Sequence, residues 1–352
     1  TVDEDEYLDY IDLLDNPDKT EAKTYPTTQI EQSNLSHQHI EGNCDLSQYE
    51  KGEKLGRDLY WKYYTLTSRD SGQHFIGQIS NNLISNMSED EINEFYKEMI
   101  ILSKLRHPNL IQIHGYNFNN FKNESKPLVI NEFYKRRTLS QIIETTRRNL
   151  IIENWTDTTK LINLFGIASG MSYLHLNGIS HRELNPNSII VDDHLYPKLT
   201  NYGFFMKLQI SNSISQSSFR LHTNPIYQSP EVLRLEPSTP SSEVYSFGMI
   251  AYEIYVQEKP FSHLTRNDQI VKEIVHKGAR PIFPDDSLPT CYRELIELCW
   301  KEDPSERPSF HDIVELLKSD RRFITTNVNE EEYKNYIQSV DQFTNQCRIN
   351  ET

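Results

Sequence analysis

The sequence predicts an α+β protein with a small β-sheet and one helix, followed by a larger and mainly helical part. Two patterns support this prediction. Between about residues 48 and 131, short apolar runs are separated by turn residues, as in β-strands. Beyond residue 132, apolar residues recur at spacings of three and four, as in helices that bury one face.

The small part is expected to begin with a β-hairpin, because two runs rich in aromatic and β-branched residues flank a turn of Ser, Asp and Gly. These runs are residues 60–66 and 74–79. Ser88 and Glu91 have the spacing of a capping box, which predicts a helix that continues to about Leu105. Further strands are expected at 110–115 and 127–131.

The larger part has long apolar stripes at 158–176 and 242–256, which predict helices of the core. Shorter helices are expected at about 268–276, 290–300 and 310–318. Residues 327–337 begin with acids and continue with apolar side chains. They predict a short helix that packs on the larger part, with an unattached tail as the alternative.

The composition limits the classes of partner. The chain of 352 residues has 51 acidic and 36 basic side chains, and its net charge of −15 opposes binding to nucleic acid or anionic lipid. Its four cysteines lack C-x-x-C spacing, so neither a zinc site nor a disulfide framework is expected. No apolar run approaches the ~18 residues needed to cross a bilayer. These features predict a cytoplasmic protein whose partners are other proteins.

Residues 1–47 are predicted to form a mostly disordered leader, because nine acidic residues and one lysine precede position 22 and a polar stretch follows. Within the leader, residues 6–14 interleave acids with bulky apolar side chains that can form one helical face. Two interpretations remain open: a solubilising tail, or a docking peptide for a groove with a basic rim.

Several motifs occur in the order and spacing found in protein kinases. The chain has His-Arg-Glu-Leu-Asn-Pro-Asn-Ser at 181–188, Asn-Tyr-Gly at 201–203, Ser-Pro-Glu at 229–231, Glu-Val-Tyr-Ser-Phe-Gly at 243–248, Cys-Trp at 299–300 and Arg-Pro at 307–308. Residues 48–322 therefore resemble a protein kinase domain of the tyrosine-kinase-like group. The resemblance implies the bilobal protein kinase fold, with an N-lobe at 48–131, a C-lobe at 132–322 and a tail at 323–352.

Phosphoryl transfer in kinases requires a Lys on the phosphates, an Asp that orients the nucleophile, and side chains that hold magnesium. The resemblance puts a different residue at each of these positions. Gln78 replaces the phosphate-binding Lys, and Glu183 replaces the catalytic Asp. Asn185 replaces the Lys of the catalytic loop, while Ser188 and Asn201 replace the Asn and Asp that bind magnesium. The catalytic positions are thus degenerate, and no metal is expected.

The nucleotide pocket implied by the resemblance is also altered. The glycine-rich loop keeps Gly56, but Asp58 and Trp61 stand where its other two glycines belong. An acid repels phosphate, and an indole fills space that glycine leaves open. The remaining pocket positions are Gln78, its partner Glu98, the gatekeeper Asn131 and the hinge residue Phe133.

Positions that hold the family's fold together are kept or conservatively replaced, with Tyr202 standing for a Phe and Glu243 for an Asp. They are His181, Tyr202 and Leu102 of an apolar stack between the lobes, Glu231 and Arg307 of a buried ion pair, and Glu243, which accepts hydrogen bonds from the catalytic loop. The resemblance also gives Arg182 the role of receiving a phosphorylated activation loop. Hydroxyl residues lie between 211 and 223, so this segment is either a phosphate-switched loop or a flexible polar one.

Retained fold positions and lost chemical positions predict a pseudokinase that acts as a protein-binding scaffold or an allosteric signalling module. Its pocket is expected to be empty or to hold ATP weakly without magnesium, and no cofactor is required. The alternative is an unconventional Ser/Thr kinase. Such an enzyme would use Glu183 as base, Lys62 or another lysine on the phosphates and a metal site built from Asn187 and Asn201.

Overall fold

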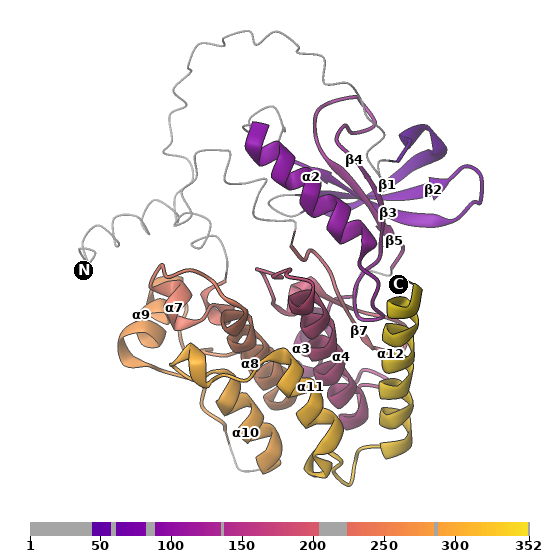
Figure 1. Ribbon diagram of the computed structural model, residues 1–352. Coiled ribbons are helices and arrows are strands. Elements are labelled where there is room, and N and C mark those ends of the chain that lie inside the picture. The colour runs from indigo at the N-terminus through magenta and orange to yellow at the C-terminus, as the bar shows by residue number, and fades with distance from the viewer. Residues whose placement is uncertain are drawn as a thin grey trace. The chain divides into compact units, whose positions relative to one another are not determined.

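The structure is a computed structural model that describes residues 44–57, 61–81, 89–134, 137–203, 224–284 and 288–350 (Figure 1). As expected, it has an N-lobe built from a β-sheet and one long helix, and a mainly helical C-lobe. The predictions for residues 6–14, for Asp58 and for the hydroxyl residues at 211–223 lie outside the described residues. None of the helices in the described segments combines the length and apolar character needed to cross a membrane.

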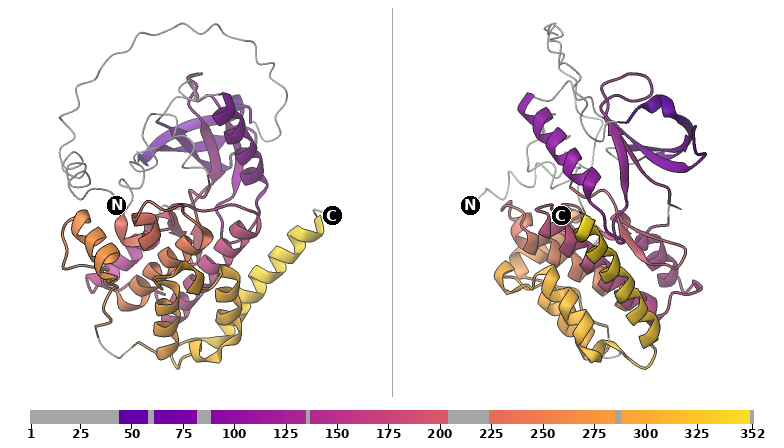
Figure 2. Two further views of the ribbon diagram at one scale, coloured as in Figure 1. Left: turned by 60° about the vertical axis from the view of Figure 1, so that its left-hand side comes forward. Right: turned by 45° about the vertical axis from the view of Figure 1, so that its right-hand side comes forward.

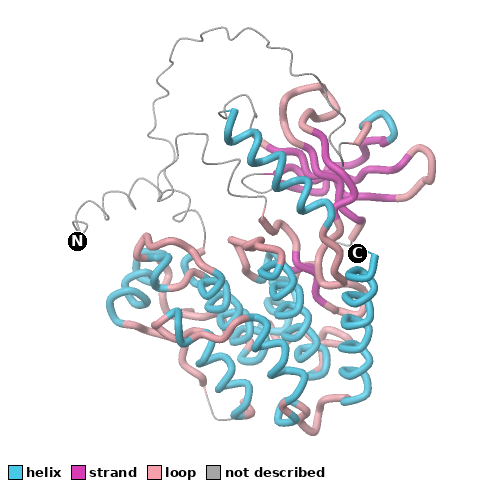
Figure 3. The backbone as a smooth tube through the Cα atoms, in the orientation of Figure 1, coloured by secondary structure: helices cyan, strands magenta, loops and turns pink. Residues whose placement is uncertain are grey.

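The N-lobe contains one antiparallel sheet with the strand order β1-β2-β3-β5-β4, drawn in magenta in Figure 3. The predicted hairpin is confirmed as β2 and β3. β4 begins three residues later than predicted, because Leu110 and Ile111 pair with Leu199 of the C-lobe instead. The bounds are β1 (Tyr49–Arg57), β2 (Trp61–Ser68), β3 (His74–Ser80), β4 (Ile113–Asn117) and β5 (Leu128–Glu132), preceded by the 3-10 turn η2 (Leu46–Gln48).

The two faces of the sheet have different chemistry. One face holds an apolar cluster that Cys44, Leu46 and Phe121 help to cover; its buried members are Leu66, Phe75, Ile79, Leu128 and Ile130. On the other face, Tyr63 is paired directly with Gln78, and side chains of directly paired residues lie on the same side of an antiparallel sheet. The helix α2 (Glu89–Lys104) packs beside β4 and buries Met99 and Leu102 (Figure 1).

The C-lobe is built around α4 (Asp157–Leu176) and α8 (Pro240–Val256), whose central residues are buried on nearly every side. Both were predicted from their apolar stripes, and α9 (Asn267–Lys277), α10 (Thr290–Cys299) and α11 (Phe310–Ser319) lie where the shorter helices were expected. The sequence did not predict α3 (Leu139–Arg147), which Thr138 and Gln141 begin with a capping box. The shorter elements are β6 (Ile189–Val191), β7 (Pro197–Leu199), α7 (Pro230–Leu233), η4 (Pro186–Ser188), η5 (Pro225–Tyr227), η6 (Pro304–Glu306) and η7 (Arg321–Phe323).

The C-terminal helix α12 (Glu330–Asn350) is longer than the short helix expected from residues 327–337. The prediction of length was wrong because apolar residues at helical spacing continue past Ile337, and Val340 among them is buried. α12 packs on α4, and Asn329 ahead of it donates its backbone N–H to Thr158 Oγ1 at 2.8 Å. Figure 2 shows α12, in yellow, running along the C-lobe. The expectation that the tail packs on the larger part is therefore confirmed.

Candidate functional site

Three side-chain amides form a chain of hydrogen bonds from the N-lobe sheet to the C-lobe. Asn131 Nδ2 on β5 donates to Gln78 Oε1 on β3 at 2.7 Å. Gln78 Nε2 donates in turn to Asn201 Oδ1 in the loop after β7, at 2.8 Å. Asn131 and Gln78 are buried. We call these three residues the amide chain; it joins two lobes through neutral groups.

The strand register explains how the amide chain forms. In β3 and β5, Ile76 is paired with Asn131 and Gln78 with Val129, so Gln78 and Asn131 are diagonal neighbours on one face. Asn201 has φ of +63°, a left-handed conformation that Asn tolerates better than most residues. Thr200 Oγ1 lies 3.2 Å from Asn201 Oδ1, so this oxygen has two hydrogen-bond partners.

Two aromatic side chains of β2 lie on the same sheet face as Gln78. Trp61 is 2% exposed and Tyr63 is 3% exposed, while Lys62 between them points to the opposite face because side chains alternate along a strand. Asn201 Nδ2 donates to the Tyr63 hydroxyl at 3.5 Å, a long hydrogen bond. The expected space-filling role of Trp61 is consistent with its burial. Gly56 of β1 is paired with Tyr63.

Tyr63 is a site residue that the sequence reasoning missed. In the pattern G-x-G-x-x-G-x-V of the kinase phosphate loop, Trp61 takes the place of the third Gly and Tyr63 that of the Val. The available signal was its position two residues after Trp61, because residues two apart in a strand share a face. Together the two rings occupy the sheet face beside the amide chain.

The catalytic-loop positions bond to their own loop. Ser188 Oγ lies 3.0 Å from the carbonyl oxygen of Glu183 and 2.9 Å from that of Asn185. The Asn185 side chain accepts from the backbone N–H of Asn187 at 2.9 Å and caps η4. Asn187 itself is exposed, and among the described residues no hydrogen bond joins it to Asn201. Among the described residues, the side chains of Asn185 and Ser188 thus bond within their own loop and not to the amide chain, while the Ser188 carbonyl oxygen accepts from the backbone N–H of Thr200, next to Asn201, at 3.0 Å.

The frame of the catalytic loop is held by buried groups. His181 is fully buried, and burial lowers the pKa of its imidazole to about 4. Glu243 on α8 accepts a short hydrogen bond from the backbone N–H of Arg182 and lies 2.6 Å from His175 Nε2. Arg182 has φ of +72°, and its side chain is exposed. These contacts match the role that the resemblance assigned to Glu243.

The loop of residues 201–203 is fixed against the N-lobe. The Tyr202 hydroxyl donates to the carbonyl oxygen of Ile111 at 2.7 Å, an interaction that a Phe at this position cannot make. Gly203 has φ of +72°, and a Cβ atom there would lie 3.2 Å from Leu102 Cδ2 and 3.3 Å from Glu98 Oε1. Both Leu102 and the buried Glu98 of α2 therefore pack directly on this loop.

The predicted ion pair between Glu231 and Arg307 has bidentate geometry. Arg307 Nη1 lies 2.7 Å from Glu231 Oε1, and Nη2 lies 2.9 Å from Oε2. Burial by itself would raise the pKa of Glu231, but the hydrogen bonds and the positive charge of Arg307 hold it below its usual value. Arg307 also donates to backbone carbonyls of residues 241, 301 and 302, so the pair anchors several segments at once.

The hinge residues differ in exposure. Asn131 is buried at the end of the amide chain, whereas Phe133 is 48% exposed and faces the His74 ring at a centroid distance of 6.0 Å. Glu132 between them accepts from Lys198 Nζ at 2.8 Å. Of the predicted pocket residues, the structure joins Gln78 and Asn131 by a hydrogen bond and leaves Phe133 at the surface.

The side chains at the metal positions do not fit a magnesium ion that carries a triphosphate. Asn201 Oδ1 is already hydrogen-bonded to Gln78 and Thr200, and an amide oxygen is a weaker ligand for a hard divalent cation than a carboxylate is. Ser188 Oγ bonds to backbone oxygens, and Gln78 offers no positive charge to phosphate. In the described part of the chain, no group of three or more His, Cys, Asp or Glu side chains is placed to hold a metal ion.

Comparison with known proteins gives consistent matches. A family model described as protein tyrosine and serine/threonine kinase matches residues 64–317. The chain is 30% identical over 278 residues to the probable serine/threonine-protein kinase drkC of Dictyostelium discoideum, covering 78% of this chain and 35% of that protein. It is 31% identical over 231 residues to the serine/threonine-protein kinase CTR1 of Arabidopsis thaliana, covering 65% and 27%. The chain thus spans roughly a third of the length of these relatives.

Proposed function

Because the chain belongs to the protein tyrosine and serine/threonine kinase family, we propose that it is a pseudokinase of the tyrosine-kinase-like group. In this proposal the bilobal kinase fold acts by binding proteins, as a scaffold or an allosteric module, and does not transfer phosphate. One observation carries the proposal. Gln78 and Asn201, which stand where the family has a Lys and an Asp, are hydrogen-bonded to each other.

Phosphoryl transfer depends on positive charge at the site. A migrating phosphoryl group is stabilised by fixed positive charge and by metal ions, and losing one preorganised electrostatic group costs about 3–4 kcal/mol of transition-state stabilisation. Gln78 and Asn201 both lack the required charge, and Ser188 lacks the amide oxygen of the family's Asn. Such losses are not additive, but several together leave a negligible rate.

The alternative is an unconventional Ser/Thr kinase, and the names of the relatives favour it, since drkC and CTR1 are both named as serine/threonine-protein kinases. Two observations on this chain weigh against it. Lys62 points to the sheet face opposite to Gln78, so it is poorly placed to bind phosphate there. Asn187 is exposed and bonds within its own loop, away from Asn201.

A thermal-shift titration of the full chain with ATP, alone and with magnesium or manganese, tests the proposal. A ligand at about 100 times its Kd stabilises a folded protein by about 2.7 kcal/mol, which is a rise of about 4 °C in Tm for a protein of this size. We expect no shift, or a small shift that is the same with and without metal. A metal-dependent rise of several degrees in the unaltered chain would favour the enzyme.

A restored variant supplies the positive control. Gln78→Lys combined with Asn201→Asp returns the two charges, and we expect this variant to gain a metal-dependent shift that the unaltered chain lacks. A phosphotransfer assay with labelled ATP, repeated with Glu183→Ala, provides a second check. Activity that disappears with Glu183→Ala would make the pseudokinase assignment wrong.

Partner binding and location belong to the same proposal. A pseudokinase would meet other proteins in the cytoplasm, and the leader segment 6–14, with its acidic and apolar side chains, is our candidate for docking. Binding of a partner identified by affinity capture should weaken when Tyr7, Tyr10 and Leu14 are changed to Ala. Equal affinity in that variant would leave the segment as a solubilising tail.

A further inference from the structure

The helix α12 lies outside the segment that matches the kinase family, which ends at residue 317, yet it contacts a part of the chain that leads into the N-lobe. The contact is made by Tyr336. Asn109, in the connection between α2 and β4, donates its side-chain N–H to the Tyr336 hydroxyl at 2.5 Å. The same Asn109 amide donates to the carbonyl oxygen of Pro197 at 2.8 Å.

The segments that meet at Asn109 and Tyr336 approach one another closely. Gly166 of α4 faces it, and a Cβ atom on Gly166 would lie 2.6 Å from Pro197, 2.7 Å from Asn109 Nδ2 and 2.7 Å from the Tyr336 hydroxyl. Real Cβ atoms do not approach other atoms so closely, so Gly is the residue that allows these segments to meet. Four segments of the chain converge here: α4, β7, the α2–β4 connection and α12.

The connection is also tied to the loop that carries the amide chain. Leu199 N–H donates to the carbonyl oxygen of Asn109 at 2.7 Å, and Ile111 N–H donates to that of Leu199 at 2.9 Å. Asn201 follows two residues after Leu199. A displacement of Asn109 is therefore transmitted both to α2 on one side and to the loop at 201–203 on the other.

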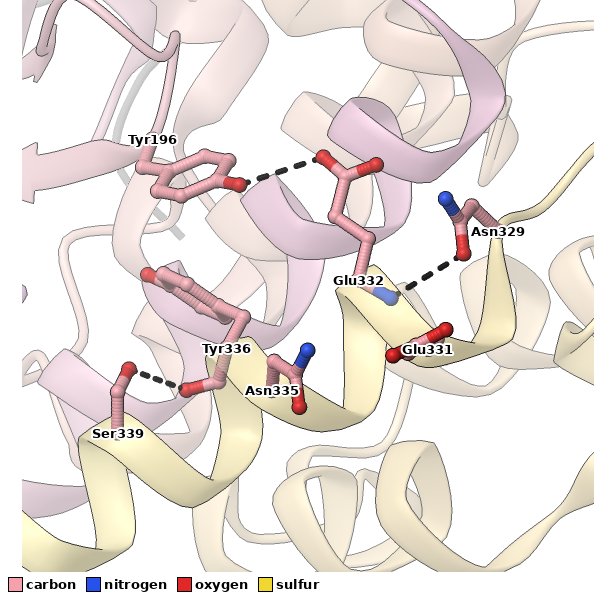
Figure 4. A pocket seen from close by; sticks show the side chains of 7 residues that line it. All are labelled: Tyr196, Asn329, Glu331, Glu332, Asn335, Tyr336 and Ser339. Atoms are coloured by element: carbon pink, nitrogen blue, oxygen red, sulfur yellow. Dashed lines mark hydrogen bonds between the residues drawn. The ribbon is translucent and has the colours of Figure 1, made fainter.

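The junction between α12 and the β6–β7 hairpin is only partly filled. Figure 4 shows Tyr196 over Tyr336, with ring centroids 4.8 Å apart, and the Tyr196 hydroxyl donates to Glu332 Oε1 at 3.3 Å. These side chains line an open hollow of about 500 Å³. Tyr333 and Val340 are the deeply buried apolar side chains among the described ones of α12. An element held by few buried groups opens more easily than the core of its domain.

We propose that α12 is a strap that controls the connection between α2 and β4, with Tyr336 as its point of contact. When α12 is docked, Tyr336 and Gly166 hold Asn109 in place. When α12 is released, Asn109 loses this partner and the connection to α2 becomes freer to move. This role of α12 does not depend on whether the protein binds a nucleotide.

Hydrogen exchange on the full chain tests the proposal, with Tyr336→Phe compared with Tyr333→Phe. Both tyrosines pack edge-on against Phe165 at 6.1 Å, and each hydroxyl makes one hydrogen bond, but the Tyr333 hydroxyl donates to Leu317 of α11 and does not reach Asn109. Tyr336→Phe should speed amide exchange in residues 105–117 by about fivefold to tenfold, the effect of one net hydrogen bond. Tyr333→Phe should leave those residues unchanged and speed exchange near residue 317.

Equal exchange in residues 105–117 for the unaltered chain and Tyr336→Phe would overturn the proposal, as would an equal increase in the two variants. A second variant, in α4, disturbs the same contact between Asn109 and Tyr336. Gly166→Ala forces Pro197, Asn109 and Tyr336 apart without removing any side-chain hydrogen-bonding group from the protein. It should raise exchange in 105–117 and in α12 together, and a change confined to α4 would count against the strap.

Discussion

Gln78 Nε2 lies 2.8 Å from Asn201 Oδ1, so the two residues that the resemblance places at the positions of the phosphate-binding Lys and the metal-binding Asp are partners of each other. In an active kinase the equivalent groups are both charged and act on the nucleotide and its metal. Here a neutral donor and a neutral acceptor satisfy one another, and Asn131 extends the chain to β5. The substitutions therefore form one connected arrangement across the lobes.

Gln78→Leu should destabilise the protein by about 2–4 kcal/mol, because it leaves the buried amide of Asn131 unpaired at a cost of about 1–3 kcal/mol and removes one partner of the partly buried Asn201 at a cost of about 1 kcal/mol. Urea denaturation measures the change in the free energy of unfolding. Gln73→Leu, at an exposed position ahead of β3, is the matched control and should change it by less than about 0.5 kcal/mol. Similar values for the two variants would show that the amide chain contributes no stability.

Two variants of Tyr63 distinguish the contribution of its ring to stability from that of its hydroxyl. Tyr63→Phe removes a long hydrogen bond of 3.5 Å and should cost less than about 1 kcal/mol. Tyr63→Val removes a buried ring and should cost about 2–4 kcal/mol, because a cavity remains beside Trp61. Thermal and urea unfolding provide the comparison. If Tyr63→Phe lowers the free energy of unfolding as much as Tyr63→Val does, the hydroxyl and not the ring accounts for the stabilisation.

His181→Phe should flatten the dependence of stability on pH. The pKa of His181 is lowered by burial to about 4, from 6.5 for an exposed imidazole, so between these values the unfolded chain binds a proton that the folded chain does not. The stability is therefore complete above pH 6.5 and is lost as the pH falls toward 4, by about 3 kcal/mol at most. His107, whose pKa burial lowers to about 3, preserves part of the slope in the variant.

Measurements of the free energy of unfolding at pH 7, 6 and 5 give this slope for both proteins. Parallel curves for the unaltered chain and His181→Phe would mean that the buried imidazole takes up its proton in the folded state as readily as in the unfolded one.

Arg307→Met should cost about 3–5 kcal/mol at neutral pH, because it leaves the Glu231 carboxylate buried without its cation. Arg307 holds the pKa of Glu231 below its usual value, so the pair contributes stability above the unfolded pKa of 4.5 and loses it as the pH falls through the folded pKa. The difference between the variant and the unaltered chain should then shrink below about pH 4.5. Adding Glu231→Leu should recover much of the loss, since an apolar pair can replace a buried ion pair.

Much of the fold could be predicted from the sequence, because long stripes such as those of α4 and α8 have one interpretation as helices. α3 was not predicted because nine residues with few apolar positions give a weak periodic signal. Its start depends on a capping box at Thr138. The start of β4 was misplaced because Leu110 pairs with Leu199, a residue far along the chain. Pairings of that kind depend on tertiary structure, which local patterns do not encode.

The sequence predicts which site residues differ from those of the family, but it does not predict which contacts these residues make. The resemblance identified Gln78 and Asn201 as chemically altered, but a hydrogen bond between residues 123 positions apart depends on the closure of two lobes. Likewise Ser188 could be recognised as a lost metal ligand, while its bonds to the carbonyls of Glu183 and Asn185 follow from the local geometry of η4. Tyr63 was overlooked because it occupies a position where any large apolar side chain would pass as core.

The hydrogen bonds between Asn131, Gln78 and Asn201 involve groups that neither gain nor lose a proton in living cells. Such a junction responds little to salt or acidity, and it requires no adenine nucleotide to complete it. The pseudokinase proposed above would keep the same contacts between these residues in a starved cell and in a well-fed one. Its state would then report which proteins surround it and not how much energy the cell has stored.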